Sequence, residues 1–256
     1  KKKINLLKIE DINSEKVHNW ILLKKPDYIF CMGYSKIIRN PLIKSFKNKI
    51  VGFHPTLLPQ NRGKHPIIWS IILGLKHIGS TFFMITEKID SGNIIHQKTI
   101  KILKSDTAKT LYDKITFVAC SQLKKIYKNL KTKDFLNKKQ IIKKGNLWRK
   151  RNFKDGLIDW RMSNIQIHDL IRALTKPYCG AAFLHKNKYY KVYSSEIVEN
   201  RTKKYQNIEY GKIVKVFNKE IVVKCGNGLI KLKNIKPIFN KAIINPIESR
   251  LQLKHR

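Results

Sequence analysis

The chain has 256 residues, with 54 Lys and Arg against 17 Asp and Glu, so its formal net charge at pH 7 is +37. Hydrophobic residues make up 42% and aromatic residues 10% of the chain, which is enough apolar material for one large or two modest domains. This composition excludes collagen, a coiled coil and wholesale disorder. Apolar runs such as residues 67–75 fall short of the ~18 residues that a membrane-spanning helix needs, so we expect no membrane partner.

The cysteine pattern and the basic charge narrow the class of protein further. Cys31, Cys120, Cys179 and Cys225 are widely spaced and form no C-x-x-C pair. This argues against a disulfide framework or a zinc ribbon, and we expect reduced thiols, a cytoplasmic protein and no metal. The excess of lysine attracts phosphate-bearing ligands, although the Ile-, Lys- and Asn-rich composition of an AT-rich genome gives the same charge without such a partner.

The first half of the chain has the pattern of an α/β domain, in which continuous apolar runs indicate buried strands and helical spacing indicates helices. Ser105 and Asp106 are placed to cap the last and longest of these helices. Helices are expected at residues 15–25, 41–46, 66–75 and 105–130, and strands at residues 28–32, 50–53, 80–86 and 94–102.

The second half of the chain begins with a lysine-dense stretch, residues 131–154, that has few apolar residues and is typical of a linker. Ser163 is then placed to cap a helix, and short strand-like runs separated by turns follow it, which predicts a small β-rich domain. Gly226-Asn227-Gly228 has the composition of a hairpin turn. The helix is expected at residues 164–174 and the strands at residues 181–185, 189–193, 210–217, 220–224 and 229–232.

The expected fold class is therefore α/β, with a Rossmann-like parallel sheet followed by a small β-rich, OB-like domain. The expected domains are a catalytic domain at residues 1–130, a basic linker at 131–154 and a C-terminal domain at 155–250.

Two polar residues follow predicted strands of the first domain. His54 ends the apolar run at residues 50–53 and opens a proline-bounded loop, where open α/β sheets place their ligands. Asp90 lies in the turn Asp90-Ser91-Gly92 after the next strand. Either residue alone is more often structural, since Asp and Gly suit turns for conformational reasons. Their conjunction at consecutive strand ends favours a site that uses both.

These residues belong to a specific pattern. The run His-Pro-x-Leu-Leu-Pro-x-x-Arg-Gly begins at His54, and Gly79-Ser80-Thr81 and Asp90-Ser91-Gly92 follow it. With these motifs, residues 26–101 resemble the folate-dependent formyltransferases, which include methionyl-tRNA, glycinamide ribonucleotide and sugar-nucleotide formyltransferases. Residues 155–183 look like the start of the small C-terminal domain of the methionyl-tRNA branch, through Asp159-Trp160, Ile171-Arg172-Ala173, Pro177 and Gly180-Ala181.

The resemblance implies transfer of a formyl group from N10-formyltetrahydrofolate to a primary amine. His54 would then move the proton and bind the oxyanion, because an imidazole titrates near neutral pH, and Asp90 would orient its ring. Arg62 and Lys64 would bind the substrate. The folate slot would be lined, largely through backbone groups, by Lys36, Ile37, Ile38, Thr56, Leu57, Leu58, Pro59, Thr86, Glu87, Lys88 and Ile89.

Two departures from the family pattern bear on activity. Most of the family has Asn two positions before the histidine, where this chain has Gly52, and loss of one oxyanion donor costs ~10²–10³ in kcat. Either Asn61, His65 or a water molecule replaces that donor, or the protein is impaired. The family's first βαβ unit, which takes ~30 residues or more, also has no counterpart after Lys1, and we expect that the sequence is N-terminally incomplete.

Three hypotheses remain for the acceptor. The loop from Arg62 to Trp69 favours an amino-sugar nucleotide in surface polysaccharide synthesis. The C-terminal domain and the basic charge favour initiator methionyl-tRNA. A catalytically impaired binding homologue is the third reading, and Gly52 is its basis. The oligomeric state stays open.

Overall fold

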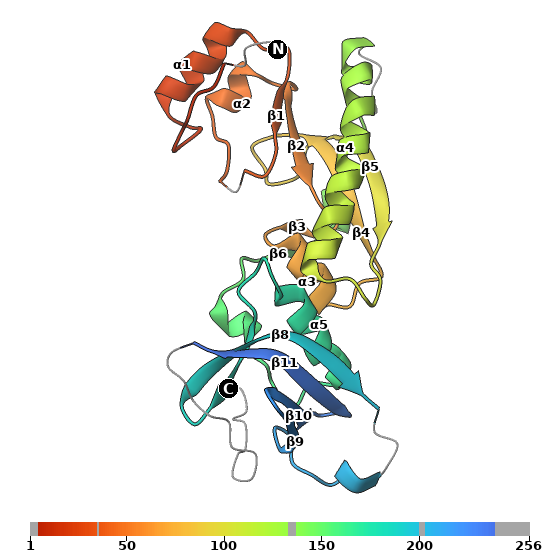
Figure 1. Cartoon of the computed structure of the whole chain (residues 1–256). Helices are drawn as coiled ribbons and strands as arrows, with labels where there is room; N and C mark the ends of the chain where they lie inside the picture. Colours follow the sequence, from red (N-terminus) through yellow and green to blue (C-terminus); the bar gives the residue numbers. More distant parts are fainter. Residues whose placement is uncertain (1–4, 35, 133–136, 200–202, 239–256) are drawn as a thin grey trace. The chain divides into compact units, whose positions relative to one another are not determined.

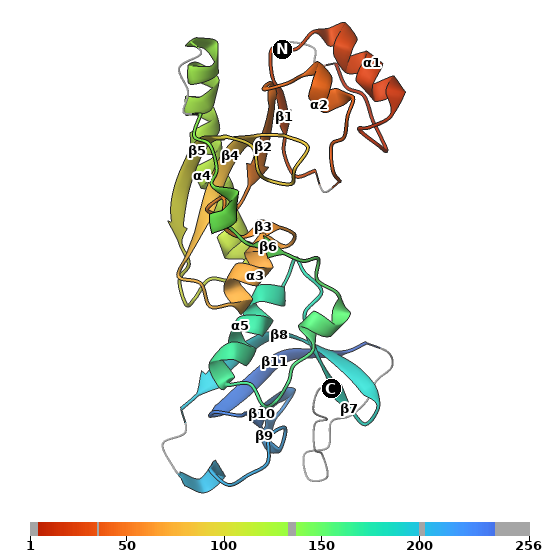
Figure 2. The same ribbon diagram turned by 180° about the vertical axis from the view of Figure 1, so that it is seen from behind.

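The computed structural model describes residues 5–34, 36–132, 137–199 and 203–238 (Figures 1 and 2). These residues form two compact units. The first contains residues up to 63, 79–99 and 118–147, and the second contains residues 64–78, 100–117 and those from 148 onward. The expected domain limits stay a prediction, and the last part of the expected C-terminal domain, residues 239–250, lies outside the described residues.

The first unit is built on a mixed four-stranded sheet with the order β1-β2-β4-β5. β1 and β2 run parallel, with Ile29 opposite Ile50, whereas β4 is antiparallel to β2, with Phe82 opposite Phe53. The sheet is therefore mixed, and only part of it is parallel as expected. Its strands are β1 (Ile29–Cys31), β2 (Ile50–His54), β4 (His77–Met84) and β5 (Ile94–Lys101).

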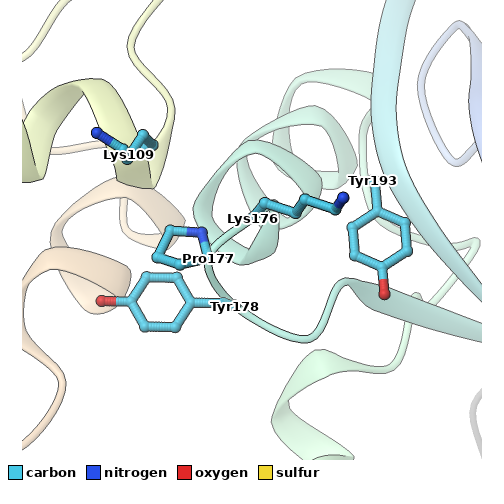
Figure 3. Close-up of a pocket in the computed structure, with 5 residues that line it drawn as sticks. All are labelled: Lys109, Lys176, Pro177, Tyr178 and Tyr193. Atoms are coloured by element: carbon cyan, nitrogen blue, oxygen red, sulfur yellow. The ribbon is translucent and has the colours of Figure 1, made fainter.

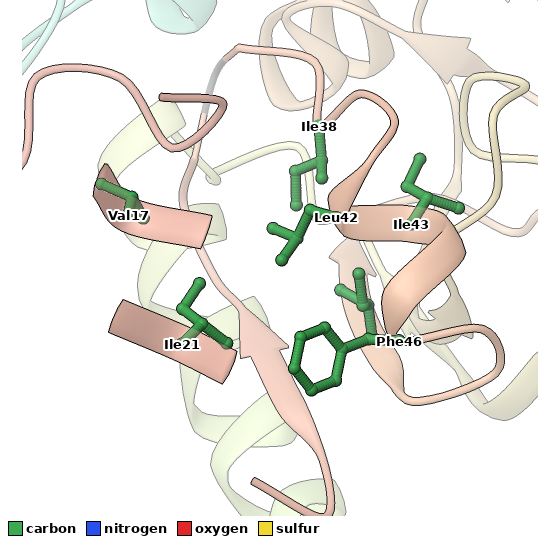
Figure 4. Packing of buried hydrophobic residues seen from close by; sticks show 7 residues of the cluster. Val17, Ile21, Ile38, Leu42, Ile43 and Phe46 are labelled. Atoms are coloured by element: carbon green, nitrogen blue, oxygen red, sulfur yellow. The ribbon is translucent and has the colours of Figure 1, made fainter. Parts of the chain in front are cut away.

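Helices cover both faces of this sheet. On one face, α1 (Glu15–Lys24) and α2 (Leu42–Ser45) enclose a cluster that contains Val17, Leu42 and Ile50 (Figure 4). On the other face, the part of α4 (Ala108–Thr132) that belongs to this unit packs Ile126 against Val51 and neighbouring residues. Because side chains alternate along a strand, Gly52 and His54 point to the same face as Ile50.

The second unit combines two helices with an antiparallel sheet of order β7-β8-β11-β10-β9. α5 (Asn164–Leu174) starts with a capping box in which the Ser163 hydroxyl accepts a hydrogen bond from the Gln166 N–H, and its buried face packs on β8. α3 (Pro66–Ile72) contacts α5. The strands are β7 (Ala181–His185), β8 (Lys188–Val198), β9 (Ile213–Phe217), β10 (Glu220–Lys224) and β11 (Leu229–Pro237).

Short elements complete the described chain: β3 (Arg62–Gly63), β6 (Leu147–Trp148), and the 3-10 helices η1 (Ile142–Lys144), η2 (Phe153–Gly156) and η3 (Lys203–Tyr205). The predicted fold class is confirmed, as an α/β sheet with a separate β-rich sheet. One predicted cap is wrong: α4 begins at Ala108, and the Thr107 hydroxyl accepts a hydrogen bond from the Thr110 N–H. Asp106 instead accepts from the Leu103 N–H.

In the part of the chain that the structure describes, every helix is too short or too polar to span a bilayer. The same residues contain no group of three or more His, Cys, Asp or Glu side chains suited to a metal ion. All four cysteines are free thiols.

Candidate active site

The loop after β2 is held rigidly against β4 and β5. The Thr81 hydroxyl donates to the Thr56 carbonyl at 2.6 Å, and the Gln97 amide donates to both Thr81 Oγ1 and the Leu58 carbonyl. Gly79 is needed for this approach, because a Cβ atom there would lie 2.2 Å from the Thr56 carbonyl. The proline-bounded loop, which starts at His54, is therefore held in one conformation by these hydrogen bonds.

His54 and Asp90 lie next to each other in the first unit. His54 Nδ1 is 3.7 Å from Asp90 Oδ2, and the two side chains are only 8% and 19% exposed. Asp90 has a left-handed backbone with φ of 49°, which Asp tolerates better than most residues. The Gly63 N–H donates to the same Asp90 oxygen at 3.0 Å. The Asp90 carboxylate thus contacts both the His54 ring, at the start of the loop, and Gly63, at its end.

The second imidazole nitrogen also has a partner. His54 Nε2 lies 3.0 Å from the Asn61 carbonyl oxygen, and a carbonyl only accepts hydrogen bonds. Nε2 therefore carries the hydrogen, and Nδ1 faces the Asp90 carboxylate. A doubly protonated ring would have an acceptor oxygen near each nitrogen.

The family's asparagine position is crowded in this chain. A Cβ atom on Gly52 would lie 2.9 Å from Ile85 Cγ1 and 3.0 Å from Phe83 Cζ. A larger side chain there requires Ile85 to move. Of the proposed replacement donors, Asn61 offers its carbonyl to His54, and His65 belongs to the second unit, where burial and then Arg151 lower the pKa of its ring.

The three segments expected to line a folate slot all lie in the first unit. Asn40, two residues after the first segment, donates through its side chain to Glu87 Oε1 in the third segment at 2.8 Å. Ile37 is half exposed, whereas Ile38 belongs to the hydrophobic core. Lys36 Nζ donates to the Glu10 carbonyl.

The remaining residues of these segments differ in what they expose. Thr56 and Leu58 bury their side chains and can present only backbone, while Leu57 and Pro59 are partly exposed. Thr86, Glu87, Lys88 and Ile89 are all exposed.

The two expected substrate-binding cations fall in different units. Arg62 belongs to the first unit, and its Nε atom is buried with no hydrogen-bond partner among the described residues. Lys64 is exposed in the second unit, where its N–H donates to the Trp148 carbonyl. An unpaired buried guanidinium nitrogen is costly, which makes Arg62 the stronger candidate for an acceptor group.

The sequence patterns missed two glutamines in the first unit, the partly buried Gln97 and the buried Gln140. Gln97 fixes the loop after β2, and Gln140 donates to the carbonyls of Asp90 and Gly92. Neither glutamine lies in a recognisable motif, and Gln140 lies within the stretch expected to be a linker. No local signal in the sequence identifies them.

A separate hollow of about 480 Å³ lies in the second unit and is lined by Lys109, Lys176, Pro177, Tyr178 and Tyr193 (Figure 3). The Lys109 ammonium is paired with Asp113. No residue predicted for the site lines this hollow.

Comparisons with known proteins agree with this geometry. Residues 5–126 match the family described as formyl transferase, and residues 152–245 match its C-terminal domain. Methionyl-tRNA formyltransferase of Buchnera aphidicola subsp. Acyrthosiphon pisum (strain Tuc7) is 30% identical over 91% of this chain and 73% of its own length. The bifunctional polymyxin resistance protein ArnA of Wigglesworthia glossinidia brevipalpis is 37% identical over 77% of this chain.

The chain spans only 30% of the length of that ArnA protein. Among solved structures, the sugar 3N-formyl transferase WlaRD, crystallised with dTDP and 5-N-formyl-THF, has a TM-score of 0.63 over 84% of this chain and 73% of its own, at 22% identity. The sequence matches in both halves, together with the paired His54 and Asp90, lead to one conclusion: the chain belongs to the formyltransferase family.

Proposed function

We propose that this chain transfers a formyl group from N10-formyltetrahydrofolate to a primary amine. The observation that carries the proposal is the pairing of His54 Nδ1 with Asp90 Oδ2 at 3.7 Å, at the end of β2. A buried imidazole beside a carboxylate suits proton transfer between two nitrogens. The folate supplies the formyl group, and the chain positions the reactants, supplies charged groups and carries the proton.

The roles of the residues follow from their contacts. The acceptor amine attacks the formyl carbon as the neutral base, loses a proton once the new C–N bond has formed, and the leaving nitrogen gains a proton when its own C–N bond breaks. We propose that a bound amine replaces one of the two contacts of the His54 ring, to Asp90 or to the Asn61 carbonyl, and that His54 then accepts the first proton and donates the second. Asp90 would orient the ring through its carboxylate, which lies 3.7 Å from Nδ1. An imidazole N–H can also donate to the oxygen that becomes negative.

The residues present fit a folate at the loop ends of the first unit. Folate has a flat, amide-like ring that needs backbone partners and apolar contact. The segments at residues 36–38 and 86–89 offer the exposed apolar side chains of Ile37 and Ile89. The hydrogen bond from Asn40, two residues after the first segment, to Glu87 connects this part of the chain to the second segment. We propose that the two segments hold the folate, with residues 56–59.

We propose an amino-sugar nucleotide as the acceptor, in surface polysaccharide synthesis. Arg62 lies in the same unit as His54 and Asp90, and its guanidinium group supports an anionic group on the acceptor. The 37% identity to ArnA and the fold likeness to a sugar 3N-formyl transferase support the same class. The reaction and its substrates would then be cytoplasmic.

Initiator methionyl-tRNA is the second candidate. Its support is the match of residues 152–245 to the family's C-terminal domain and the 30% identity to a methionyl-tRNA formyltransferase over 91% of the chain. The charge of +37 supports an RNA partner.

A direct assay separates the candidates. The purified chain is incubated with N10-formyltetrahydrofolate and either a panel of 4-amino-4-deoxy sugar nucleotides or charged initiator tRNA. Turnover of a sugar nucleotide, with none of the tRNA, is the expected result. Formylation of the tRNA alone, with a binding constant that weakens steeply as salt rises, overturns the sugar proposal. Binding of the folate without transfer to any acceptor overturns formyl transfer and indicates the impaired homologue.

A further inference from the structure

A segment of the expected linker lies against both loops of the candidate site. We name residues 137–147 the strap; they belong to the first unit, as do His54 and Asp90. The strap is anchored to β5 by two backbone hydrogen bonds between Lys138 and Ile94, of 2.8 and 3.0 Å. The residues of the strap that follow Lys138 contact the two loops of the candidate site.

Gln140 fastens the strap to the turn that carries Asp90. The glutamine is only 6% exposed, and its Nε2 donates to the carbonyls of Asp90 at 3.1 Å and Gly92 at 2.6 Å. Two carbonyl acceptors require the NH₂ end of the amide at this position. The amide oxygen is left buried without a partner among the described residues. That arrangement costs free energy, which the two donated bonds offset.

The far end of the strap holds the loop that carries His54. Asn146 Oδ1 accepts a hydrogen bond from the Asn61 N–H at 2.8 Å, and the Asn146 carbonyl accepts one from the Arg62 N–H at 3.2 Å. Asn61 is the residue whose carbonyl faces His54 Nε2. At Gly145, a Cβ atom would lie 2.0 Å from the Pro59 carbonyl, so the strap touches the loop along its length.

We propose that Gln140 is a positioning residue for formyl transfer, and that the strap sets the distance between the Asp90 carboxylate and the His54 ring. The inference rests on the proposed function. Proton transfer depends on geometry within about 0.5 Å, and a misplacement of ~1 Å can cost about 10²-fold in rate. The turn at Asp90 has a left-handed residue, and Gln140 holds the carbonyl groups of Asp90 and Gly92, on either side of Ser91.

The test compares two variants with a matched control. Gln140→Met keeps the volume and removes both donors. We expect kcat to fall about 10- to 100-fold while KM for the folate changes less than about threefold, because no folate segment is touched. Gln122→Met is the control: Gln122 is also fully buried and donates to Ser80 and His96, so it should lose stability with kcat unchanged. Equal losses of kcat in both variants overturn the proposal.

Gln140→Glu supplies a signature that a merely structural role would not give. An ionised carboxylate cannot donate to the two carbonyls, whereas a protonated carboxyl group can donate to one of them. The activity of Gln140→Glu relative to the unmodified chain should therefore rise as the pH is lowered from 8 to 6, since burial and two carbonyls favour protonation. A ratio that stays constant with pH contradicts the inference.

Amide hydrogen exchange makes the inference testable apart from activity. We expect faster amide exchange at residues 86–93 in Gln140→Met than in Gln122→Met, once the exchange rates are corrected for any difference in melting temperature between the two variants. No change at these residues overturns the positioning role, even if the chain transfers formyl groups. Conversely, absence of any formyl transfer by the unmodified chain defeats the proposed function while the exchange result still reports on the strap.

Discussion

The Asp90 carboxylate touches two parts of one loop: its Oδ2 atom accepts the Gly63 N–H at 3.0 Å and faces His54 Nδ1 at 3.7 Å. His54 begins that loop and Gly63 ends it. The carboxylate therefore fixes the shape of the loop as well as the charge beside the ring. These two effects can be separated by substitution.

Asp90→Asn removes the charge and keeps an oxygen that can accept the Gly63 N–H. We expect kcat to fall about 10²- to 10⁴-fold, the range of general acid–base catalysis, with the melting temperature nearly unchanged. Asp90→Leu also removes the acceptor, so it should lower the melting temperature as well. Steady-state kinetics and thermal unfolding of both variants check this.

The control for this prediction is Asp113→Asn, which neutralises an exposed carboxylate that pairs with Lys109 on α4. It should leave kcat unchanged. Full activity in Asp90→Asn would show that the carboxylate charge takes no part in the reaction.

A second prediction concerns Gly52. Because a Cβ atom there would lie 2.9 Å from Ile85 Cγ1, Gly52→Asn should destabilise the chain by about 1–3 kcal/mol through overpacking. Adding Ile85→Ala should recover part of that loss, and a double-mutant cycle in urea measures the coupling. If Gly52→Asn alone is as stable as the unmodified chain, the Ile85 side chain can move aside without a loss of stability.

The same double variant tests whether the site lacks an oxyanion donor. If it does, Gly52→Asn with Ile85→Ala should exceed the kcat of Ile85→Ala alone, by up to ~10²-fold. A lower kcat would mean that Gly52 is part of a working variant of the site. Either result is read only after folding has been verified by circular dichroism.

Much of the fold follows from local pattern. The helices at α1 and α5 and the strands β2, β7 and β10 were predictable because apolar spacing and caps such as Ser163 are local signals. The antiparallel direction of β4 against β2 was not, because strand direction depends on the connection and the partner strand. The start of α4 was misplaced because Asp106 and Thr107 are both good capping residues, and the structure uses Thr107 as the cap.

The site was predictable to the extent that it follows a sequence motif. His54 and Asp90 could be named because His54 ends a strand, Asp90 lies in the turn that follows another, and both belong to the same family motifs. The supporting contacts could not: Gln140 and Asn146 each form two hydrogen bonds to backbone groups distant in the sequence, and such contacts leave no periodicity in the sequence. The crowding at Gly52 likewise depends on Ile85, which is distant in the sequence and adjacent only in the folded chain.

Cysteine reactivity gives a third prediction, independent of catalysis. Burial raises the pKa of Cys225 to about 12 and also raises the pKa of Cys31, whereas Cys120 and Cys179 are exposed. The thiolate is the reactive form. Brief iodoacetamide treatment of the native chain at pH 8, followed by peptide mass spectrometry, should therefore label Cys120 and Cys179 first. Early labelling of Cys225 would contradict the burial of β10 and its turn.

The fourth prediction is a pH dependence of stability in the second unit. Asp155 accepts hydrogen bonds from the Arg149 guanidinium and the Asn152 N–H, and these contacts, with that of Arg149 the largest, lower the pKa of its carboxyl group from 3.8 to about 2. A lowered pKa means that the stabilisation is complete above pH ~4 and is lost as the pH falls toward 2. Because water screens this surface pair, we expect about 1 kcal/mol.

Asp155→Asn should accordingly lower the free energy of unfolding by about 1 kcal/mol at pH 7 and by much less at pH 2.5, where the native carboxyl group is already partly protonated. Urea unfolding followed by tryptophan fluorescence at both pH values measures the difference. Asp113→Asn provides the comparison, because its ion pair is exposed on both sides and such pairs contribute little. A loss for Asp155→Asn that is equal at the two pH values would show that the Arg149 pair does not stabilise the ionised carboxylate.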